Sequence, residues 1–346
     1  MIIDANMYWF PEEIFEDEKE ASRFLSEIPR QYGIDGYMKI NEETGLKQIV
    51  IEKPAGSQGL NYVQHEYLLE KQLEDMNAAG VEKAILKIPG CHEWMSIDTC
   101  RTFNTGMAEY AKRSNGKLIP LAVLPPYGTK ECFKELERCR EELGIKGIQL
   151  CAHYGNHYLD SEIFADFFEK LNEEETTVYI HHTPVPVHYE DIYEYNNLRR
   201  FYGRCTDQTI AIGRELFSGF FEKYSNLKFV HSMLGGGFFG IANMLFPHKA
   251  KNEEEVSRFD TNSASVEEIF KKHIFFEMSH AQPWGKEQLQ CAVSVLGADH
   301  IIFGTSYPVR KEWLTEGPEF INNLDISDDD KEKILYKNAE RIYHIW

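Results

Sequence analysis

The chain has 346 residues, of which 42% are apolar and 13% aromatic, so it can form a large hydrophobic core and is not a disordered protein. Its formal net charge of −19 argues against a nucleic acid or an anionic membrane as partner, since both need basic patches. The seven cysteines form no Cys-x-x-Cys pair, which indicates neither a zinc knuckle nor a redox motif. Reduced thiols and the absence of a signal-peptide pattern favour a cytoplasmic protein, and no apolar run is long enough for a membrane span.

Short apolar runs alternate with amphipathic segments along almost the whole chain. Residues 1–9 are typical of a buried strand, 12–30 are compatible with a helix, and 31–64 are rich in turns, with KQIVIEK as one strand of a hairpin. Seven further strands are expected at 81–88, 118–126, 144–153, 176–182, 226–231, 273–280 and 300–308. Helices are expected at 65–80, 97–114, 129–142, 161–172, 206–224, 265–272, 286–296 and 328–343.

This alternation predicts an α/β protein with a parallel sheet, and eight strand–helix units fit a closed (β/α)8 TIM barrel. We expect a single domain over residues 1–346, with an insertion at 31–64 after the first strand and a closing helix at 328–346. A doubly wound open sheet is the alternative. No Gly-x-Gly-x-x-Gly follows the first strand, so we expect no nucleotide cofactor.

The strand over residues 176–182 ends in two histidines, His181 and His182. Side chains at the carboxyl ends of barrel strands face the reaction site. Because neighbouring residues of a strand point to opposite faces, only one of the two histidines is expected in the barrel interior, the other being a packing or rim residue.

Several segments together resemble one branch of the amidohydrolase superfamily, that of aminocarboxymuconate-semialdehyde decarboxylase and the hydroxybenzoate (resorcylate-type) decarboxylases. The matching stretches occur in the family's order and reach almost the whole chain: LEDMNAAGVEKAIL (73–86), GIKGIQL (144–150), VYIHHTP (178–184), LFSGFFEKYSNLKFVHSMLGGGFF (216–239), LGADHIIFGTSYP (296–308) and ISDDDKEKILYKNAERIY (326–343). The resemblance implies a barrel with a metal-centred site at its mouth.

The family's usual metal ligands are mostly different residues in this chain. The resemblance implies a His-x-His on strand one, a histidine ending strands five and six, and an aspartate ending strand eight. The corresponding positions are Asn6-Met7-Tyr8, His181, Met233 and Ser306. Since one imidazole with an amide, a phenol, a thioether and a hydroxyl is a poor ligand set, the ordinary metal site is expected to be altered or absent.

Other histidines stand at strand ends and offer a relocated metal site. Expected strands four to seven end near His153, His181 or His182, His231 and His280, and three of these converging on one cavity would bind a divalent metal such as Zn or Mn. We assign His181 and His231 as its ligands, because alternation places His231 on the same face as Met233. The alternative is that His153 and His280 line a polar pocket or cap helices, and that His231 is a hydrogen-bonded core residue.

Four further residues are site candidates. Tyr8 is a proton donor or a ligand of a substrate oxygen, or else an interior tyrosine with a satisfied hydroxyl. Arg204 follows strand five and suits a substrate carboxylate, although loop arginines often face solvent. Asn6 and Ser306 are expected to contact substrate, and Ser306 lacks the Gly-x-Ser-x-Gly setting of a nucleophile.

The resemblance thus favours a decarboxylase-like lyase or a hydrolase that acts on a small carboxylated or aromatic substrate. His181, His231, His280 and Tyr8 are the expected catalytic residues, and Asn6, His153, His182, Arg204 and Ser306 the expected substrate-binding ones. Two alternatives remain: a catalytically silent homologue that serves as partner subunit of an active paralogue, and a small-molecule binding protein. A homo-oligomer, or a heteromer with such a paralogue, is implied.

Overall fold

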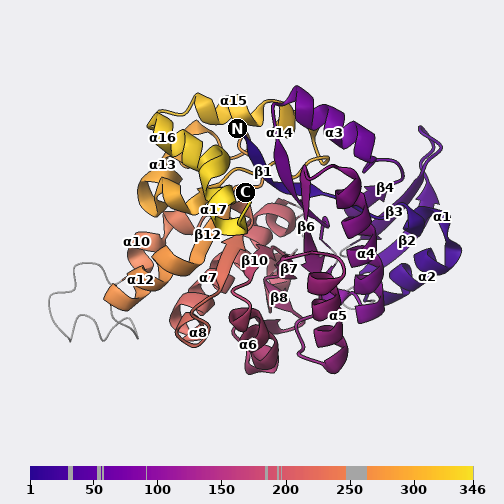
Figure 1. The fold of residues 1–346 in the computed structure, drawn as a ribbon, viewed down its shortest axis with the longest axis horizontal. Helices are drawn as coiled ribbons and strands as arrows, with labels where there is room; N and C mark the ends of the chain where they lie inside the picture. The colour runs from indigo at the N-terminus through magenta and orange to yellow at the C-terminus, as the bar shows by residue number, and fades with distance from the viewer. Residues whose placement is uncertain are drawn as a thin grey trace.

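The computed structural model describes residues 1–29, 34–52, 56, 58–90, 92–183, 186–192, 195, 197–246 and 263–345. It confirms the predicted barrel, with eight parallel strands in the order β1-β5-β6-β7-β10-β11-β12-β13 (Figure 1). The strands are β1 (Ile3–Tyr8), β5 (Lys83–Lys87), β6 (Leu118–Val123), β7 (Gly147–Cys151), β10 (Thr177–His181), β11 (Lys228–His231), β12 (Ile274–Glu277) and β13 (Ile301–Ile302).

The barrel closes between its first strand and the segment that follows its last strand. The Ser306 amide donates to the Asn6 carbonyl at 2.8 Å, and the Tyr8 amide donates to the Tyr307 carbonyl at 2.8 Å. These bonds join the two edges of the sheet, so the open-sheet alternative is wrong. They also bring the carboxyl end of β1 beside the segment after β13, which is where functional residues of a barrel gather.

Helices surround the barrel strands and cover their outer faces (Figure 1). The helices of at least five residues are α2 (Glu18–Glu27), α3 (Leu69–Ala78), α4 (Ile97–Arg113), α5 (Lys130–Glu141), α6 (Ala165–Glu173), α7 (Arg204–Phe217), α12 (Ser263–His273), α13 (Lys286–Leu296), α14 (Lys311–Thr315), α15 (Gly317–Asn322), α16 (Asp328–Glu332) and α17 (Asn338–Tyr343). Shorter turns include α1 (Glu13–Glu16), η2 (His92–Trp94), α8 (Phe220–Lys223), α9 (Met233–Gly236) and α10 (Ala242–Leu245), and a π-helical turn, η5 (Leu198–Gly203), leads into α7.

The segment between β1 and α3 forms a separate antiparallel sheet of three strands, β2 (Asp35–Ile40), β3 (Lys47–Glu52) and β4 (Gln58–Val63). The expected strand KQIVIEK coincides with β3, which pairs with both neighbours. This sheet lies at one side of the barrel next to α1 and α2 (Figure 1). The predicted insertion at 31–64 also includes residues 31–33, 53–55 and 57, which lie outside the described residues, as does Trp346 of the predicted closing helix.

The barrel interior is filled at its amino-terminal end by a layer of apolar side chains. Its members are Ile3, Ala5, Ile85, Leu121, Tyr179, Val230, Phe275 and Ile302, together with Ala339, Ile342 and Ile345 from the end of the chain. Helix α17 therefore closes this end of the barrel and lies over its centre in Figure 1. This layer fills the amino-terminal end of the barrel, so a ligand is expected at the opposite end.

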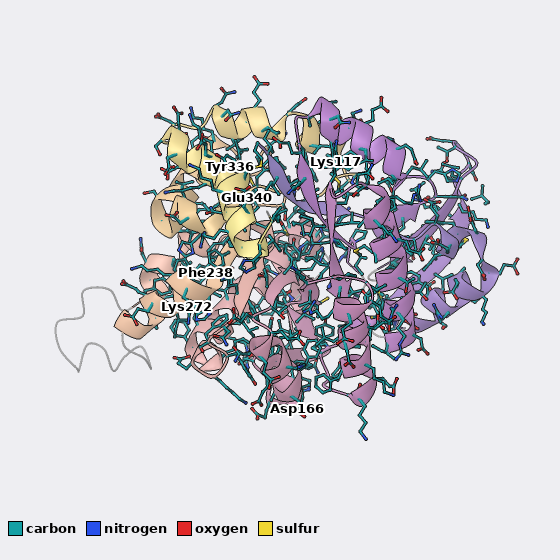
Figure 2. All side chains as sticks on the ribbon, in the orientation of Figure 1. Lys117, Asp166, Phe238, Lys272, Tyr336 and Glu340 are labelled. Carbon is teal, nitrogen blue, oxygen red and sulfur yellow. The ribbon has the colours of Figure 1, made fainter. Side chains whose placement is uncertain are left out.

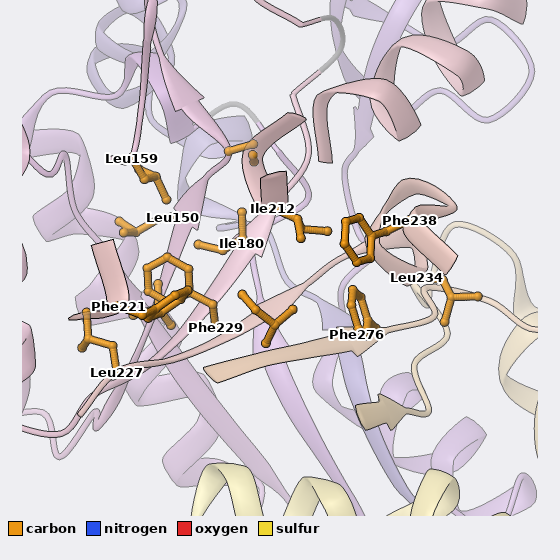
Figure 3. Packing of buried hydrophobic residues seen from close by; sticks show 14 of the residues in the cluster. Leu150, Leu159, Ile180, Ile212, Phe221, Leu227, Phe229, Leu234, Phe238 and Phe276 are labelled. Carbon is orange, nitrogen blue, oxygen red and sulfur yellow. The ribbon is translucent and has the colours of Figure 1, made fainter. Parts of the chain in front are cut away.

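A second and larger core lies between the strands and the helices. Figure 3 shows Phe229 of β11 against Phe221, and Phe276 of β12 against Phe238, with ring centroids 5.2 and 6.2 Å apart. Ile180 of β10 also belongs to this outer core. Residues 180, 229 and 276 therefore face the helices, so the neighbouring residues 179, 230 and 275 face the barrel interior.

Charged side chains cover the outside of the molecule. Asp166 on α6 and Lys272 on α12 are examples that Figure 2 labels, and both are exposed. In the part of the chain that the structure describes, no helix combines the length and the apolar character that crossing a bilayer requires.

Candidate functional site

A layer of charged and polar side chains lies above the apolar layer of the barrel. Asn6, Lys87 and Glu277 come from β1, β5 and β12, and each is 0% exposed. The Lys87 ammonium donates to the Ala5 carbonyl at 2.9 Å and lies 3.1 Å from the centre of the Tyr179 ring. In these contacts a carbonyl and an aromatic face replace part of the hydration that the buried ammonium has lost.

Glu277 is the acceptor at the centre of this layer. Its Oε2 accepts from Asn6 Nδ2 at 2.9 Å, from the Tyr179 hydroxyl at 2.9 Å and from Ser279 Oγ at 3.3 Å, while Oε1 accepts from the Ser279 amide. Gly304 leaves room for the carboxylate, because a Cβ there would meet Glu277 Oε1 at 1.9 Å. The carboxylate is therefore held in one position from several strands.

Both ionisable groups of this layer titrate near neutrality. Burial raises the pKa of Glu277 from 4.5 to about 7, although the Lys87 charge and the hydrogen bonds of Tyr179 and Ser279 oppose the rise. Burial lowers the pKa of Lys87 from 10.5 to about 7, against the attraction of Glu277 and Asp4. Groups with pKa values near 7 can hold or release a proton at working pH, as acid–base catalysis requires.

Tyr8 and His181 form a pair directly above this layer. His181 Nδ1 is 2.7 Å from the His182 carbonyl, which can only accept, so Nδ1 carries the proton. The other ring nitrogen, Nε2, then has a free lone pair and accepts from the Tyr8 hydroxyl at 3.3 Å. Burial holds the pKa of His181 well below its ordinary value, so the ring is neutral. Burial raises the pKa of Tyr8 to about 12, so its hydroxyl keeps its proton.

His182, His280 and Arg204 surround that pair. The His182 ring stacks on the His181 ring at 4.2 Å, and His280 stacks on Trp313 at 3.9 Å. Burial is the main reason that the pKa of His280 is lowered to about 4, and the Arg204 charge contributes to the decrease.

Arg204 is the first residue of α7, and its Nε is buried without a hydrogen-bond partner among the described residues. Burial is the main influence on the pKa values of Tyr8, His181 and His182, and the positive charge of Arg204 is a smaller one that favours the phenolate and the neutral imidazoles. Burial lowers the pKa of Arg204 itself to about 10, and the neighbouring Arg200 contributes to the decrease. The guanidinium charge is therefore poorly compensated, which favours the binding of an anion there.

The predicted metal pair of His181 and His231 is wrong, because the His231 ring points toward α7 and not toward His181. His231 Nδ1 lies 2.9 Å from Gln208 Oε1 and its Nε2 lies 2.8 Å from Glu215 Oε2, both residues being on α7. His231 therefore faces the helices, like Phe229. The residue of this segment that faces the mouth is Ser232, whose hydroxyl accepts from the His182 amide at 3.1 Å.

His153 belongs to a hydrogen-bond network at the end of β10. Its Nε2 lies 2.7 Å from the Thr183 hydroxyl and 3.5 Å from Asp207, and its Nδ1 lies 2.9 Å from the Gly155 carbonyl. Asp207 accepts from the Thr183 amide at 3.0 Å, so the network ties the end of β10 to α7. His153 is thus joined to the helix that begins with Arg204, and its predicted contact with substrate stays a prediction.

The carboxyl ends of the last three strands have unusual backbone conformations. Met233, Ser279 and Ser306 have φ angles of 51°, 63° and 59°, which non-glycine residues rarely adopt. The Ser306 hydroxyl accepts from Asn6 Nδ2 at 3.0 Å and donates to the Ser279 carbonyl at 3.2 Å. Backbone strain of this kind gathers at functional sites, where surrounding contacts hold it.

The structure brings seven of the predicted residues to one place and leaves two elsewhere. Those at or next to the mouth are Asn6, Tyr8, His181, His182, Arg204, His280 and Ser306. Their catalytic and binding roles remain predictions. Sequence reasoning missed Lys87 and did not assign Glu277, and no local pattern around either residue indicates a buried charge.

Comparison with known proteins places the chain in a family. The model of the family described as amidohydrolase matches residues 71–345. The chain belongs to the amidohydrolase family. One relative of this amidohydrolase chain is 2-amino-3-carboxymuconate-6-semialdehyde decarboxylase of Dictyostelium discoideum, 26% identical over 70% of the chain and 66% of the relative. Another is gamma-resorcylate decarboxylase of Polaromonas sp., 24% identical over 80% of the chain and 87% of the relative. The resemblance inferred from the sequence is thus confirmed.

Solved structures of the family have the same fold. A 2,6-dihydroxybenzoate decarboxylase in complex with 2,6-dihydroxybenzoate aligns with a TM-score of 0.71 at 17% identity, over 99% of this chain and 98% of that one. A dihydroxybenzoic acid decarboxylase from Polaromonas sp., with bound manganese and 2-nitroresorcinol, aligns with a TM-score of 0.70 at 18% identity, over 99% of this chain and 96% of that one. At such identities the likeness establishes the barrel fold.

Proposed function

We propose that this amidohydrolase is a decarboxylase-like lyase that acts on a small aromatic carboxylate and has an altered metal site. The two relatives described above are decarboxylases of carboxylated substrates, and two of the solved neighbours are complexes with a dihydroxybenzoate and a nitroresorcinol. The observation that carries the proposal is the Tyr8–His181 hydrogen bond at the barrel mouth, together with Arg204 at the start of α7, whose Nε is buried without a hydrogen-bond partner among the described residues.

The residues at the family's ligand positions do not fit a divalent metal. Asn6 directs its Nδ2 donor toward Glu277 and Ser306, and the Tyr8 hydroxyl keeps its proton and donates to His181. Only His181 Nε2 offers the kind of lone pair that such an ion prefers, and it already accepts a hydrogen bond. The Lys87 ammonium lies in the layer below and adds positive charge to the same region, since it lowers the pKa of His181. The proposed reaction therefore contains no step through a metal at these positions.

Arg204 and Asn6 supply the contacts that would orient the substrate. The guanidinium binds the carboxylate by charge-assisted hydrogen bonds. Asn6 Oδ1 is buried and has no hydrogen-bond partner among the described residues. Because a buried acceptor without a donor is costly, a substrate hydroxyl next to the carboxylate is the group that would satisfy it. A hydroxybenzoate carries both groups on adjacent ring carbons.

Tyr8 is the proposed proton donor. Its hydroxyl gives a proton to the ring carbon that bears the carboxylate, and the bond from that carbon to the carboxylate then breaks. The electron pair of the broken bond restores the aromatic ring, and carbon dioxide leaves. Arg204 stabilises the Tyr8 phenolate, and His181 Nε2 passes a proton from solvent back to it. The reaction thus consumes one proton from solvent for each carbon dioxide released.

The test is carbon dioxide release from a panel of hydroxybenzoates and related acids, with wild type and Arg204→Met. Loss of a charged hydrogen-bond partner is worth about 1.5–3 kcal/mol, so we expect kcat/KM to fall about 10- to 100-fold. Arg113→Met is the matched control, since Arg113 pairs with Glu70 at the exposed surface. Equal rates in wild type and Arg204→Met would refute the role of Arg204. Tight binding without turnover of any acid would favour a binding protein or a silent homologue.

A further inference from the structure

A second cluster of metal-ligating side chains lies at the barrel mouth, one strand away from the Tyr8–His181 pair. His92 and Glu93 belong to the turn η2 that follows β5, and Cys151 is the last residue of β7. One ligand atom of each residue, a ring nitrogen, a carboxylate oxygen and the thiol sulfur, lies within 4.8 Å of the other two. None of the three stands at a position that the family resemblance assigns to a metal ligand.

His92 is the member of this cluster that most needs a partner. The residue is 2% exposed, and both of its ring nitrogens are buried without a hydrogen-bond partner among the described residues. The carbonyls of Gly90 and Leu150 lie close enough to influence the pKa of the ring, but neither is in hydrogen-bond geometry. An imidazole that is shielded from water and has no hydrogen bond costs free energy, which a ligand on either nitrogen would recover.

The spacing and the chemistry of the three side chains suit a tetrahedral ion. Cys151 Sγ lies 3.7 Å from Glu93 Oε2. In a tetrahedral zinc site with ordinary bond lengths, the sulfur and oxygen ligands are about 3.5 Å apart. Imidazole nitrogen, thiolate sulfur and carboxylate oxygen together are a ligand set for a borderline ion such as Zn²⁺, rather than for the hard ions Mg²⁺ or Ca²⁺.

We propose that His92, Glu93 and Cys151 bind one Zn²⁺ ion. Three protein ligands leave a fourth position for water or for a substrate atom, as in catalytic zinc sites. The site adjoins the reaction centre, because the His92 ring packs edge-on against the His181 ring at 5.6 Å. The inference goes beyond the proposed function and does not depend on it, since zinc can bind whether or not the chain decarboxylates any acid.

Zinc binding is measured directly, without reference to activity. Full-length protein freed of metal is titrated with Zn²⁺ in competition with a chromophoric chelator, and with Co²⁺ to detect a thiolate-to-cobalt charge-transfer absorption. We expect one Zn²⁺ per chain, a charge-transfer band in wild type, and no such band in Cys151→Ser. Both Cys151→Ser and His92→Gln should weaken zinc binding by about 100-fold or more, since each removes one of three ligands.

Three further variants show whether zinc binds to these side chains or to a thiol or imidazole elsewhere in the barrel. Cys100→Ser removes another buried thiol, on α4 outside the cluster, and should leave zinc affinity unchanged. Glu93→Gln changes a partly exposed side chain, so it should weaken binding even if Cys151→Ser impairs folding. His181→Gln should retain the zinc. The proposal is overturned if wild type binds no zinc, if Cys151→Ser and Glu93→Gln bind it as tightly as wild type, or if only His181→Gln loses it.

Discussion

Glu277 gives the barrel a pH dependence that one substitution should remove. In the folded chain its pKa is raised from 4.5 to about 7, so between these pH values the folded state binds more protons than the unfolded state. The contribution of Glu277 to stability is then largest below pH 4.5 and is lost as the pH rises through 7, by about 3 kcal/mol in total. Glutamine cannot ionise, so Glu277→Gln should lack this decline.

The expected effect is large enough to measure by thermal unfolding. For a chain of 346 residues, about 2.1 cal/mol/K per residue gives an unfolding entropy of about 0.7 kcal/mol/K, so about 3 kcal/mol corresponds to about 4 °C in Tm. Glu277→Gln loses about 1–3 kcal/mol at any pH, because its amide nitrogen meets donors that the carboxylate accepted. The Tm deficit of the variant should therefore shrink by about 4 °C from pH 5 to pH 8. Glu142→Gln, at an exposed position, controls for the lost charge. A deficit that is the same at both pH values would refute the raised pKa.

Three further predictions test the mouth and its surroundings. Tyr8→Phe should lower kcat of decarboxylation by about 100-fold with little change in KM, as steady-state kinetics would reveal; an unchanged kcat contradicts the role of Tyr8 as proton donor. His231→Ala should destabilise the fold by about 3 kcal/mol in thermal unfolding, because Glu215 stays buried without its partner, yet leave KM unchanged; a raised KM would mean that His231 contacts substrate. Gly236→Ala should destabilise far more than Gly237→Ala, since a Cβ at Gly236 meets a backbone oxygen of α7 at 1.8 Å and one at Gly237 meets nothing within 4 Å; equal melting temperatures contradict this.

The fold was predictable because its signals are periodic and repeated. The expected strand over residues 118–126 contains β6, the expected helix at 286–296 coincides with α13, and the expected helix at 97–114 matches α4 to within one residue. Errors at element ends do not change the topology, because eight alternating units leave few ways to connect parallel strands. The number of units favoured a closed barrel, but only the hydrogen bonds between β1 and the segment after β13 exclude an open sheet.

The site was less predictable because it depends on which face each residue occupies. His231 and Met233 were expected in the interior, but the apolar layer contains Val230, so the interior face of β11 passes through 230 and 232. A shift of one residue in this assignment moves every side chain of a strand to the opposite face. The positive φ angles of Met233 and Leu234 then turn the chain away after the strand ends, which no apolar pattern reveals.

Buried charges were missed for a related reason. Lys87 is the last residue of β5, and a lysine at a strand end is usually solvent-exposed. Only its partners identify its environment, and they lie far away in the sequence, on β1, β10 and β12. Likewise, His92 is a candidate metal ligand only because Cys151, the last residue of β7, lies close to it. Contacts between distant segments follow from the three-dimensional arrangement, and a single sequence does not contain the distances.

The charge at the mouth leads to a last prediction, which concerns protons rather than rates. The chain carries a net charge of −19, yet its barrel mouth contains Arg204 near His181, with Lys87 below. An anion bound there raises the pKa values of both Lys87 and Glu277 from about 7, and both groups then take up protons. Binding of a benzoate at pH 7.5 should thus be accompanied by uptake of up to about one proton.

Isothermal titration calorimetry in two buffers of different ionisation enthalpy measures this uptake directly. The observed binding enthalpy should change with the buffer in wild type, and this dependence should be weaker in Lys87→Met, which removes one of the two groups. Lys311→Met is a suitable control, because Lys311 pairs with Asp75 at the surface and its side chain is 58% exposed. An enthalpy that is independent of the buffer would mean that the anion does not reach the Lys87–Glu277 layer.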